Sequence, residues 1–224
     1  MTCMSSTGRV LMSGWNNPNT PYISCLFRDS RNRIWAGCPN QGLALLNTHN
    51  GGIEMVIANE FSNVSSIAED SKGRIYYSEL GTGFSRFNPA DMKTEVYTEF
   101  AKRSRKGGSL NNDWIHIMIV DSWNRLWIGH DNGADCFDID RSEFIDNDKL
   151  SAAMGTSGCT CILEEREGII WFGTTKGVIV YNMTNGVASI LDTSKGLSSN
   201  DIRGMVKDGE GYIWVSTPGG VNRI

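Results

Sequence analysis

The residue types that catalyse reactions are few in this sequence, and they do not fall into catalytic spacings. The three histidines, His49, His116 and His130, form no closely spaced pair that could bind a metal ion. Six cysteines are present, but Cys159 and Cys161 are too close in sequence for a zinc knuckle, so the thiols are expected to pack as small hydrophobic side chains. No nucleophile elbow, phosphate-binding loop, kinase motif or receiver motif is present. The sequence predicts a protein that is not an enzyme and uses no cofactor or metal.

Polar and aromatic residues gather instead in short segments between the expected strands. Amides, carboxylates, hydroxyls and an aromatic plate suit the binding of a neutral saccharide, and they equally suit solvated loops. Trp114 stands out because it replaces a polar residue just before a strand, where an exposed aromatic is a binding candidate. The complete candidate set is Glu79, Asn111, Asn112, Asp113, Trp114, His130, Asp131, Asn132, Lys176, Asn200 and Asp201.

The elements that must position these residues come from an internal repeat. A nine-residue pattern occurs five times, with an acid six residues before an aromatic, a Gly or Asn three before it and an aliphatic one before it. The repeated aromatics are Trp35, Tyr76, Trp127, Trp171 and Trp214. They are spaced by roughly 40 to 50 residues, the length of one propeller blade. We therefore expect an all-β propeller with four-stranded antiparallel blades, either a closed five-bladed ring or part of a seven-bladed one.

Each unit holds four expected strands, the third beginning after a glycine and the fourth weaker and more polar, as suits an outer edge. The expected blade cores are about 23–57, 64–98, 115–145, 159–191 and 202–224, in one propeller domain spanning residues 1–224. The fifth unit has no fourth strand of its own. Residues 8–12 precede the first unit at the spacing of a fourth strand, so we expect them to close the ring on the last blade.

Two features of the repeat invite a functional interpretation as well as a structural one. The repeated aromatics could stack on sugars, but their fixed position between aliphatics favours packing between blades. The repeated acids (Asp29, Asp70, Asp121, Glu165 and Asp208) could suggest a ring of metal ligands. Accepting backbone N–H bonds of the following turn is favoured, because one acid per blade leaves them too far apart to share an ion.

Composition restricts the partners. The net charge of −4 gives no basic stripe for nucleic acid, and no apolar run reaches the length of a membrane helix. The basic run of residues 102–106 is expected to be a solvated loop, with docking of an anionic partner as the alternative. No signal peptide is recognised at residues 1–15, so the chain is expected to be cytoplasmic or a piece of a longer secreted or membrane protein.

The repeat resembles that of the two-component regulator propellers. The fourth unit carries the resemblance best, from Glu165 to Thr174 (EREGIIWFGT) and then Gly177-Val178 and Tyr181-Asn182. The segments 109–113 and 196–201 are similar to those that lead into the first strand of that family's blades. The resemblance covers essentially the whole chain. It implies the periplasmic sensor region of a hybrid two-component system of Bacteroidetes, in which glycan fragments are sensed.

The resemblance implies a sensor or ligand-binding module with an oligosaccharide as ligand and a second propeller or signalling domains as partners. Two alternatives remain. One is a protein-interaction propeller without a small ligand. The other is a metal-dependent enzyme similar to the streptogramin lyases, for which His130 is the histidine on the expected face.

Overall fold

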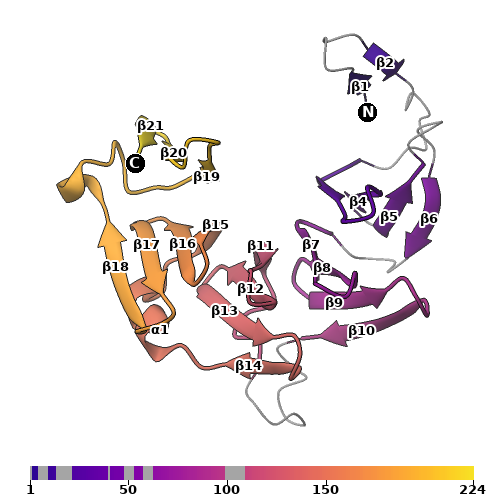
Figure 1. The fold of residues 1–224 in the computed structure, drawn as a ribbon, viewed down its shortest axis with the longest axis horizontal. Helices are drawn as coiled ribbons and strands as arrows, with labels where there is room; N and C mark the ends of the chain where they lie inside the picture. The colour runs from indigo at the N-terminus through magenta and orange to yellow at the C-terminus, as the bar shows by residue number, and fades with distance from the viewer. Residues whose placement is uncertain are drawn as a thin grey trace. The chain divides into compact units, whose positions relative to one another are not determined.

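The computed structural model describes residues 2–4, 10–13, 22–39, 41–47, 53–57, 63–98 and 109–224. The basic run at 102–106 lies outside these residues. The chain divides into two compact units, Met1–Val64 and Ser65–Ile224 (Figure 1). No helix among the described residues is long and apolar enough to span a membrane.

The first unit contains one four-stranded sheet and one short hairpin. The sheet has the order β3 (Cys25–Arg28), β4 (Ile34–Cys38), β5 (Gly42–Leu46) and β6 (Ile53–Ile57), and we call it blade 1. Strand β1 (Thr2–Met4) pairs with β2 (Val10–Ser13) in a separate sheet. Closure of the ring by residues 8–12 on the last blade stays a prediction.

The second unit contains four further blades, each an antiparallel meander. Blade 2 is β7 (Ile67–Glu69), β8 (Ile75–Glu79), β9 (Gly83–Asn88) and β10 (Lys93–Tyr97). Blade 3 is β11 (Ile115–Val120), β12 (Arg125–His130), β13 (Gly133–Asp138) and β14 (Glu143–Ile145). Blade 4 is β15 (Cys159–Arg166), β16 (Ile169–Thr174), β17 (Gly177–Asn182) and β18 (Val187–Leu191). Blade 5 has three strands, β19 (Gly204–Lys207), β20 (Ile213–Thr217) and β21 (Gly220–Arg223).

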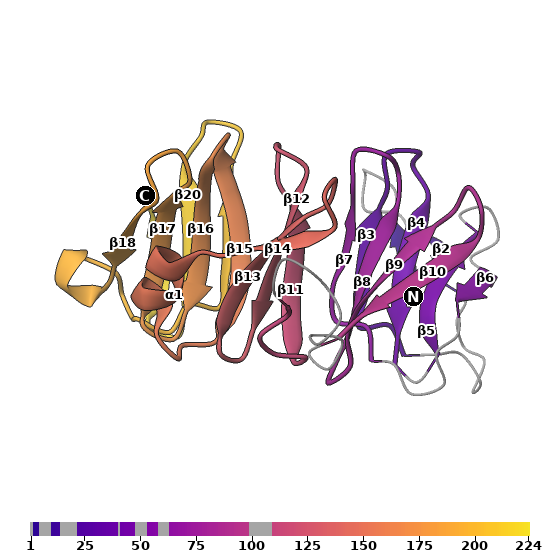
Figure 2. The same ribbon diagram turned by 90° about the horizontal axis from the view of Figure 1, so that it is seen from below.

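The expected β-propeller fold is confirmed by this strand order. Within the second unit the first strands of successive blades, β7, β11, β15 and β19, lie next to one another (Figure 1), and the sheets follow side by side (Figure 2). The helix α1 (Asp148–Met154) is inserted between blades 3 and 4 and packs against β13 and β18. A short 3-10 helix, Thr193–Lys195, follows β18.

The repeated acid organises the hairpin between the first and second strands. In blade 3, Asp121 accepts the backbone N–H groups of Trp123 (3.0 Å) and Arg125 (2.9 Å). The turn residue Asn124 has φ of 58°, and the turn residues of the other units, Asn32, Gly73, Gly168 and Gly211, also have positive φ. Asp29, Asp70 and Asp208 cap their hairpins with the same backbone bonds. The predicted turn cap is confirmed for these four aspartates.

The same acid also bonds the aromatic six residues later, which explains their fixed spacing. The indole Nε1 of Trp127 donates to Asp121 Oδ2 over 2.8 Å, and Trp35, Trp171 and Trp214 donate in the same way to Asp29, Glu165 and Asp208. In blade 2 the hydroxyl of Tyr76 donates to Asp70 over 3.2 Å.

Hydrogen bonds also lower the pKa of one of these acids, Asp29. Burial raises the pKa of Asp29, but hydrogen bonds from the Trp35 indole and from the backbone and guanidinium of Arg33 outweigh it. The pKa of this carboxyl therefore lies below its ordinary value.

In the second unit, the repeated aromatics Tyr76, Trp127 and Trp171 pack between blades, and Trp214 does not. Trp127 packs on Phe172 of blade 4, and Trp171 packs among Ile202, Ile213 and Val215 of blade 5. Trp214 differs, because 39% of its surface is exposed. Blade 5 is the last blade of its unit, so this unit offers no following sheet to cover Trp214. The packing predicted for this residue is not found.

Candidate functional site

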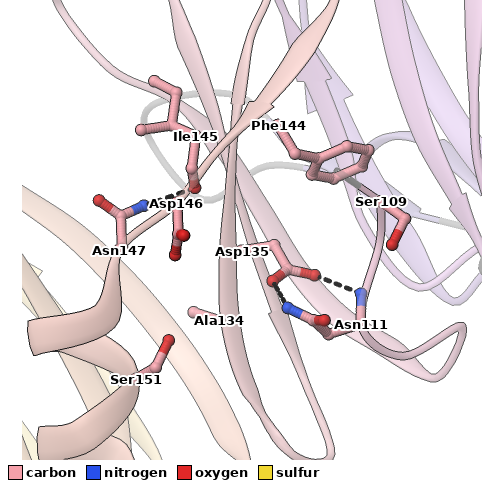
Figure 3. Close-up of a pocket in the computed structure, with 9 residues that line it drawn as sticks. All are labelled: Ser109, Asn111, Ala134, Asp135, Phe144, Ile145, Asp146, Asn147 and Ser151. Carbon is pink, nitrogen blue, oxygen red and sulfur yellow. Dashed lines mark hydrogen bonds between the residues drawn. The ribbon is translucent and has the colours of Figure 1, made fainter. Parts of the chain in front are cut away.

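A cavity of about 430 Å³ lies beside blade 3, at the end of the sheet where β13 begins and β14 ends. Three segments surround it: the connection before β11, the two strands β13 and β14, and the segment leading into α1 (Figure 3). Its lining residues are Ser109, Asn111, Ala134, Asp135, Phe144, Ile145, Asp146, Asn147 and Ser151. This end of the blade is the one at which the sequence predicted a ligand site, but Asn111 alone of the predicted residues lines the cavity.

Asp135 and Asn111 form the polar wall of this cavity. The Asp135 carboxylate accepts the Asn111 backbone N–H (2.7 Å) and its side-chain amide (2.5 Å), as Figure 3 shows. Both oxygens are engaged, and the carboxylate is largely buried. The bonds therefore fix the connection before β11 against the start of β13, and they fix the orientation of the Asn111 side chain in the wall.

His130 supports this wall from inside the blade. Only 2% of its surface is exposed, because it ends β12 beside the start of β13. Its Nδ1 accepts the backbone N–H of Asn132 (3.2 Å), so we assign the ring proton to Nε2. Nε2 lies 3.3 Å from Asp135 Oδ2, at an angle that does not meet hydrogen-bond geometry. His130 thus faces Asp135 in the interior, and its role in binding a ligand stays a prediction.

The opposite wall is built by the segment that enters α1. Asn147 donates from its side chain to the carbonyl of Ile145 (3.1 Å), and its amide oxygen accepts from Tyr181 of blade 4 (3.4 Å). Helix α1 is anchored by the buried side chains of Leu150 and Met154. This anchoring leaves Ser151 exposed beside the cavity.

The lining of the cavity offers hydrogen-bonding groups and one apolar surface. The polar part combines carboxylates, amides and hydroxyls, which accept from and donate to hydroxyl groups of a ligand. Phe144 supplies an apolar surface and is held edge-on against Phe137, with ring centroids 5.1 Å apart. Pockets that bind small molecules combine apolar surface with a few placed polar groups in this way. The described residues contain no group of three or more metal-ligating side chains.

The other predicted residues near blade 3 lie outside the cavity. Trp114 is 53% exposed and rests on the turn of blade 2, where a Cβ on Gly81 would lie 3.6 Å from its ring. The amide oxygen of Asn112 accepts the Trp114 backbone N–H (2.7 Å). Asp131 is exposed, and its Oδ1 lies 2.5 Å from Nε2 of His116. Asn132 is also exposed.

The remaining predicted residues serve structure or point to solvent. Glu79 and Asp113 are buried, and Glu79 accepts from the Ser85 hydroxyl (2.9 Å). Asn200 accepts the backbone N–H of Thr193 (2.8 Å), and Asp201 pairs with Arg203. Lys176 lies exposed in the turn between β16 and β17. The structure does not bring these residues into the blade 3 cavity.

Sequence reasoning missed several residues that the structure brings into view. Asp135, Phe144, Asn147 and Ser151 line the cavity, and His116 is the exposed histidine of the described chain. One signal was available: Asp135 stands where blades 1 and 4 carry Ala44 and Ile179. A charge in the interior of a strand that is otherwise apolar marks a functional or structural polar site.

Comparison with known proteins supports the fold and the repeat. The family model described as two-component regulator propeller matches residues 17–40 and 196–219. Histidine kinase P4 of Formosa agariphila is 27% identical over 172 residues, which cover 72% of this chain and 12% of that protein. The identification of two-component regulator propeller repeats is thereby confirmed for residues 17–40 and 196–219.

Three similar solved structures are propellers of different function. The extracellular domain of a putative hybrid two-component system from B. thetaiotaomicron has a TM-score of 0.65 at 16% identity, covering 96% of this chain and 34% of that one. PorZ, from the type-IX secretion system of Porphyromonas gingivalis, has a TM-score of 0.79 at 14% identity, with coverage of 97% and 35%. Virginiamycin B lyase from Staphylococcus aureus has a TM-score of 0.71 at 15% identity, with coverage of 100% and 76%. At these identities the likeness shows the fold alone.

Proposed function

We propose that this chain, whose blades are two-component regulator propeller repeats, is a ligand-binding part of an extracytoplasmic sensor. The family match and the likeness to the extracellular domain of a hybrid two-component system support a signalling module. The chain spans 12% of the curated relative and about a third of the sensor structure, so signalling would require partner domains. A second propeller and a kinase region are the partners we propose.

The ligand we propose is a neutral glycan fragment, bound in the cavity of blade 3. The observation that carries this proposal is the combination of Asn111, Asp135 and Phe144 around about 430 Å³ of space. Hydroxyl groups of a sugar would hydrogen-bond to the polar wall, and its C–H face would cover the phenyl ring. The carboxylates at the cavity and the chain's net charge of −4 disfavour an acidic glycan.

A glycan array followed by calorimetric titration tests this assignment. We expect the purified chain to bind a neutral oligosaccharide, and Asn111→Ala to weaken binding by roughly 10-fold, the effect of removing one hydrogen bond to the ligand. Lys176→Ala is the matched control, because Lys176 lies at the same end of the neighbouring blade but not at the cavity. Binding that is unchanged in Asn111→Ala would place the ligand elsewhere.

A non-enzymatic role is part of the same proposal. Incubation of the purified chain with labelled ATP should give no phosphorylated product, and phosphorylation of the chain would contradict this role. A protein-interaction propeller is the alternative, and it would be favoured by a stable protein partner together with no binding on the glycan array.

A lyase is the second alternative, and the structure changes the residue that would serve it. His130 is buried, so among the histidines that the structure describes, such an enzyme would use the exposed His116 with its partner Asp131. We expect no opening of virginiamycin B by this chain. Ring opening that is lost with a chelator and in His116→Ala would support the lyase instead.

A further inference from the structure

The residue that ends the second strand of blades 4 and 5 caps the turn to the third strand. In blade 4, Thr174 Oγ1 accepts the backbone N–H of Lys176 (3.0 Å) and donates to the carbonyl of Gly177 (2.8 Å). In blade 5, Thr217 makes the same two bonds within its own turn. A threonine is therefore sufficient to hold a turn of this length.

Blade 3 carries His130 at this position, in a turn of the same length. Its Nδ1 accepts the backbone N–H of Asn132 (3.2 Å), which is the bond that the threonines accept in blades 4 and 5. The imidazole adds a second nitrogen, Nε2, which is buried, lies 3.3 Å from Asp135 Oδ2 and has no hydrogen-bond partner among the described residues. A buried N–H without a partner costs about 1–3 kcal/mol, so capping of the turn does not explain the imidazole.

The carboxylate that faces Nε2 is also not required to hold the connection before the blade. In the strand register of blade 5, the place of Asp135 is taken by the neutral Asn222, whose Oδ1 accepts the backbone N–H of Ser198 (3.0 Å). Asp135 accepts the backbone N–H of Asn111 in the corresponding connection of blade 3 (2.7 Å). A neutral amide therefore suffices for this bond, and the carboxylate of blade 3 calls for another explanation.

The two groups that blade 3 adds meet at its cavity. Asp135 lines the cavity, and its carboxylate also accepts the side-chain amide of Asn111 (Figure 3). Each carboxylate oxygen can accept a second hydrogen bond. A small rotation of this carboxylate would align Oδ2 with the Nε2–H of His130 and release the amide of Asn111 toward the cavity. A hydroxyl group of a ligand could then take the place of the amide.

We infer that His130 is a positioning residue of the blade 3 site, whose Nε2–H holds Asp135 in the orientation that binds a ligand hydroxyl group. The hydroxyl would donate to the Asp135 carboxylate and accept from the amide of Asn111. His130 would not touch the ligand, because only 2% of its surface is exposed. This inference rests on the proposed function, because it assumes that a saccharide occupies the cavity.

His130→Thr is the decisive variant, because blades 4 and 5 carry threonine at this position. The variant keeps the turn cap and removes Nε2, so we expect its Tm to equal or exceed that of the parent chain. Its affinity for the saccharide selected on the array should fall by roughly 10-fold, measured at a temperature at which every variant is folded. His130→Gln supplies an N–H near the place of Nε2 but not the acceptor of the turn, so it should lower the Tm and bind more tightly than His130→Thr.

Thr174→Val is the matched control. It removes the cap of the corresponding turn in blade 4, so it should lower the Tm without changing the affinity.

A double-mutant cycle tests whether His130 acts through Asp135. Asp135→Asn supplies the residue type of blade 5 and should also lose affinity for the saccharide. Residues that act as one unit show losses that do not add. We therefore expect His130→Thr to cause no further loss of affinity in the Asp135→Asn chain, and additive losses would overturn the positioning role.

The outcomes separate this inference from the proposed function. If no saccharide binds to the parent chain, or if Asn111→Ala binds it as tightly as the parent, both are overturned. If Asn111→Ala weakens binding while His130→Thr binds as tightly as the parent, the role of His130 alone is overturned. If His130→Thr also lowers the Tm, equal affinities of His130→Gln and His130→Thr overturn that role. A loss of affinity in His130→Thr at unchanged Tm, absent from the Asp135→Asn chain, supports it.

Discussion

The repeated acid of each blade bonds the aromatic of the second strand, and we expect its carboxylate to be a principal source of stability. In Asp121→Ala, blade 3 loses the acceptor of four hydrogen bonds, from the backbone of Trp123 and Arg125, the Arg125 side chain and the Trp127 indole. The Asp121 side chain is completely buried, and so is Trp127. An indole N–H left buried without a partner costs about 1–3 kcal/mol. Breaking a buried ion pair costs about 3–5 kcal/mol, and because these losses overlap we expect a total of about 3–5 kcal/mol.

Urea unfolding followed by tryptophan fluorescence and circular dichroism measures this loss, and blade 5 supplies the control. Asp208 accepts the equivalent bonds from the backbone of Glu210 and Tyr212 and from the Trp214 indole. Because Trp214 is partly exposed, water can replace the lost acceptor, and Asp208→Ala should be clearly milder. A loss below about 1 kcal/mol in Asp121→Ala, or equal losses in both variants, would refute the role of burial in this argument.

Three further changes test the packing and electrostatics. Gly173→Ala places a Cβ 2.4 Å from the Cys161 sulfur and 2.7 Å from Ile202, so urea unfolding should show a loss of about 1–3 kcal/mol in the free energy of unfolding. Adding Cys161→Ala should recover part of this loss. Full stability of the single variant would contradict this expectation. The pKa of Asp29 is lower in the folded state than in the unfolded state, where it is about 4. The carboxylate therefore contributes to the free energy of unfolding above the unfolded pKa, and this contribution is lost as pH falls through the folded pKa. Between pH 5 and 3, the free energy of unfolding should fall less steeply in Asp29→Asn than in the parent chain. Equal slopes would remove Asp29 as a cause. Leu150→Ala, at the buried face of α1, should cost about 2–5 kcal/mol, and a neutral result would mean that α1 is not anchored through this residue.

The repeat made most of the fold predictable. The fourth strands of blades 1, 3 and 4 end at Ile57, Ile145 and Leu191, where the expected blade cores end, because turn glycines and the hairpin acid set the register of every blade. The helix α1 was missed because it has seven residues and only two buried side chains, Leu150 and Met154. So short a helix has no apolar stripe that periodicity can detect.

The candidate site was harder to predict, because a residue at the end of a strand can turn into the blade or lie exposed in the following turn. His130 was assigned to a surface turn, but it is the last residue of β12 and turns inward toward Asp135. His116 was treated as part of a packing strand, although blades 1, 2 and 4 carry the hydroxyl side chains of Ser24, Ser65 and Thr160 at its position, and blade 5 carries Arg203. Comparing the copies residue by residue identifies His116, whereas the burial of His130 depends on its contacts with Asn132 and Asp135 across the turn.

Hydrogen exchange measured with and without the selected oligosaccharide tests the central claim most directly, because it reports where the ligand binds on the intact chain. We predict slower exchange at 109–111, 134–135 and 144–151, the segments that line the cavity, with no change in the hairpins at 121–125 and 165–168. Protection confined to those hairpins, or no protection at a saturating ligand concentration, would contradict a ligand site on this face of blade 3.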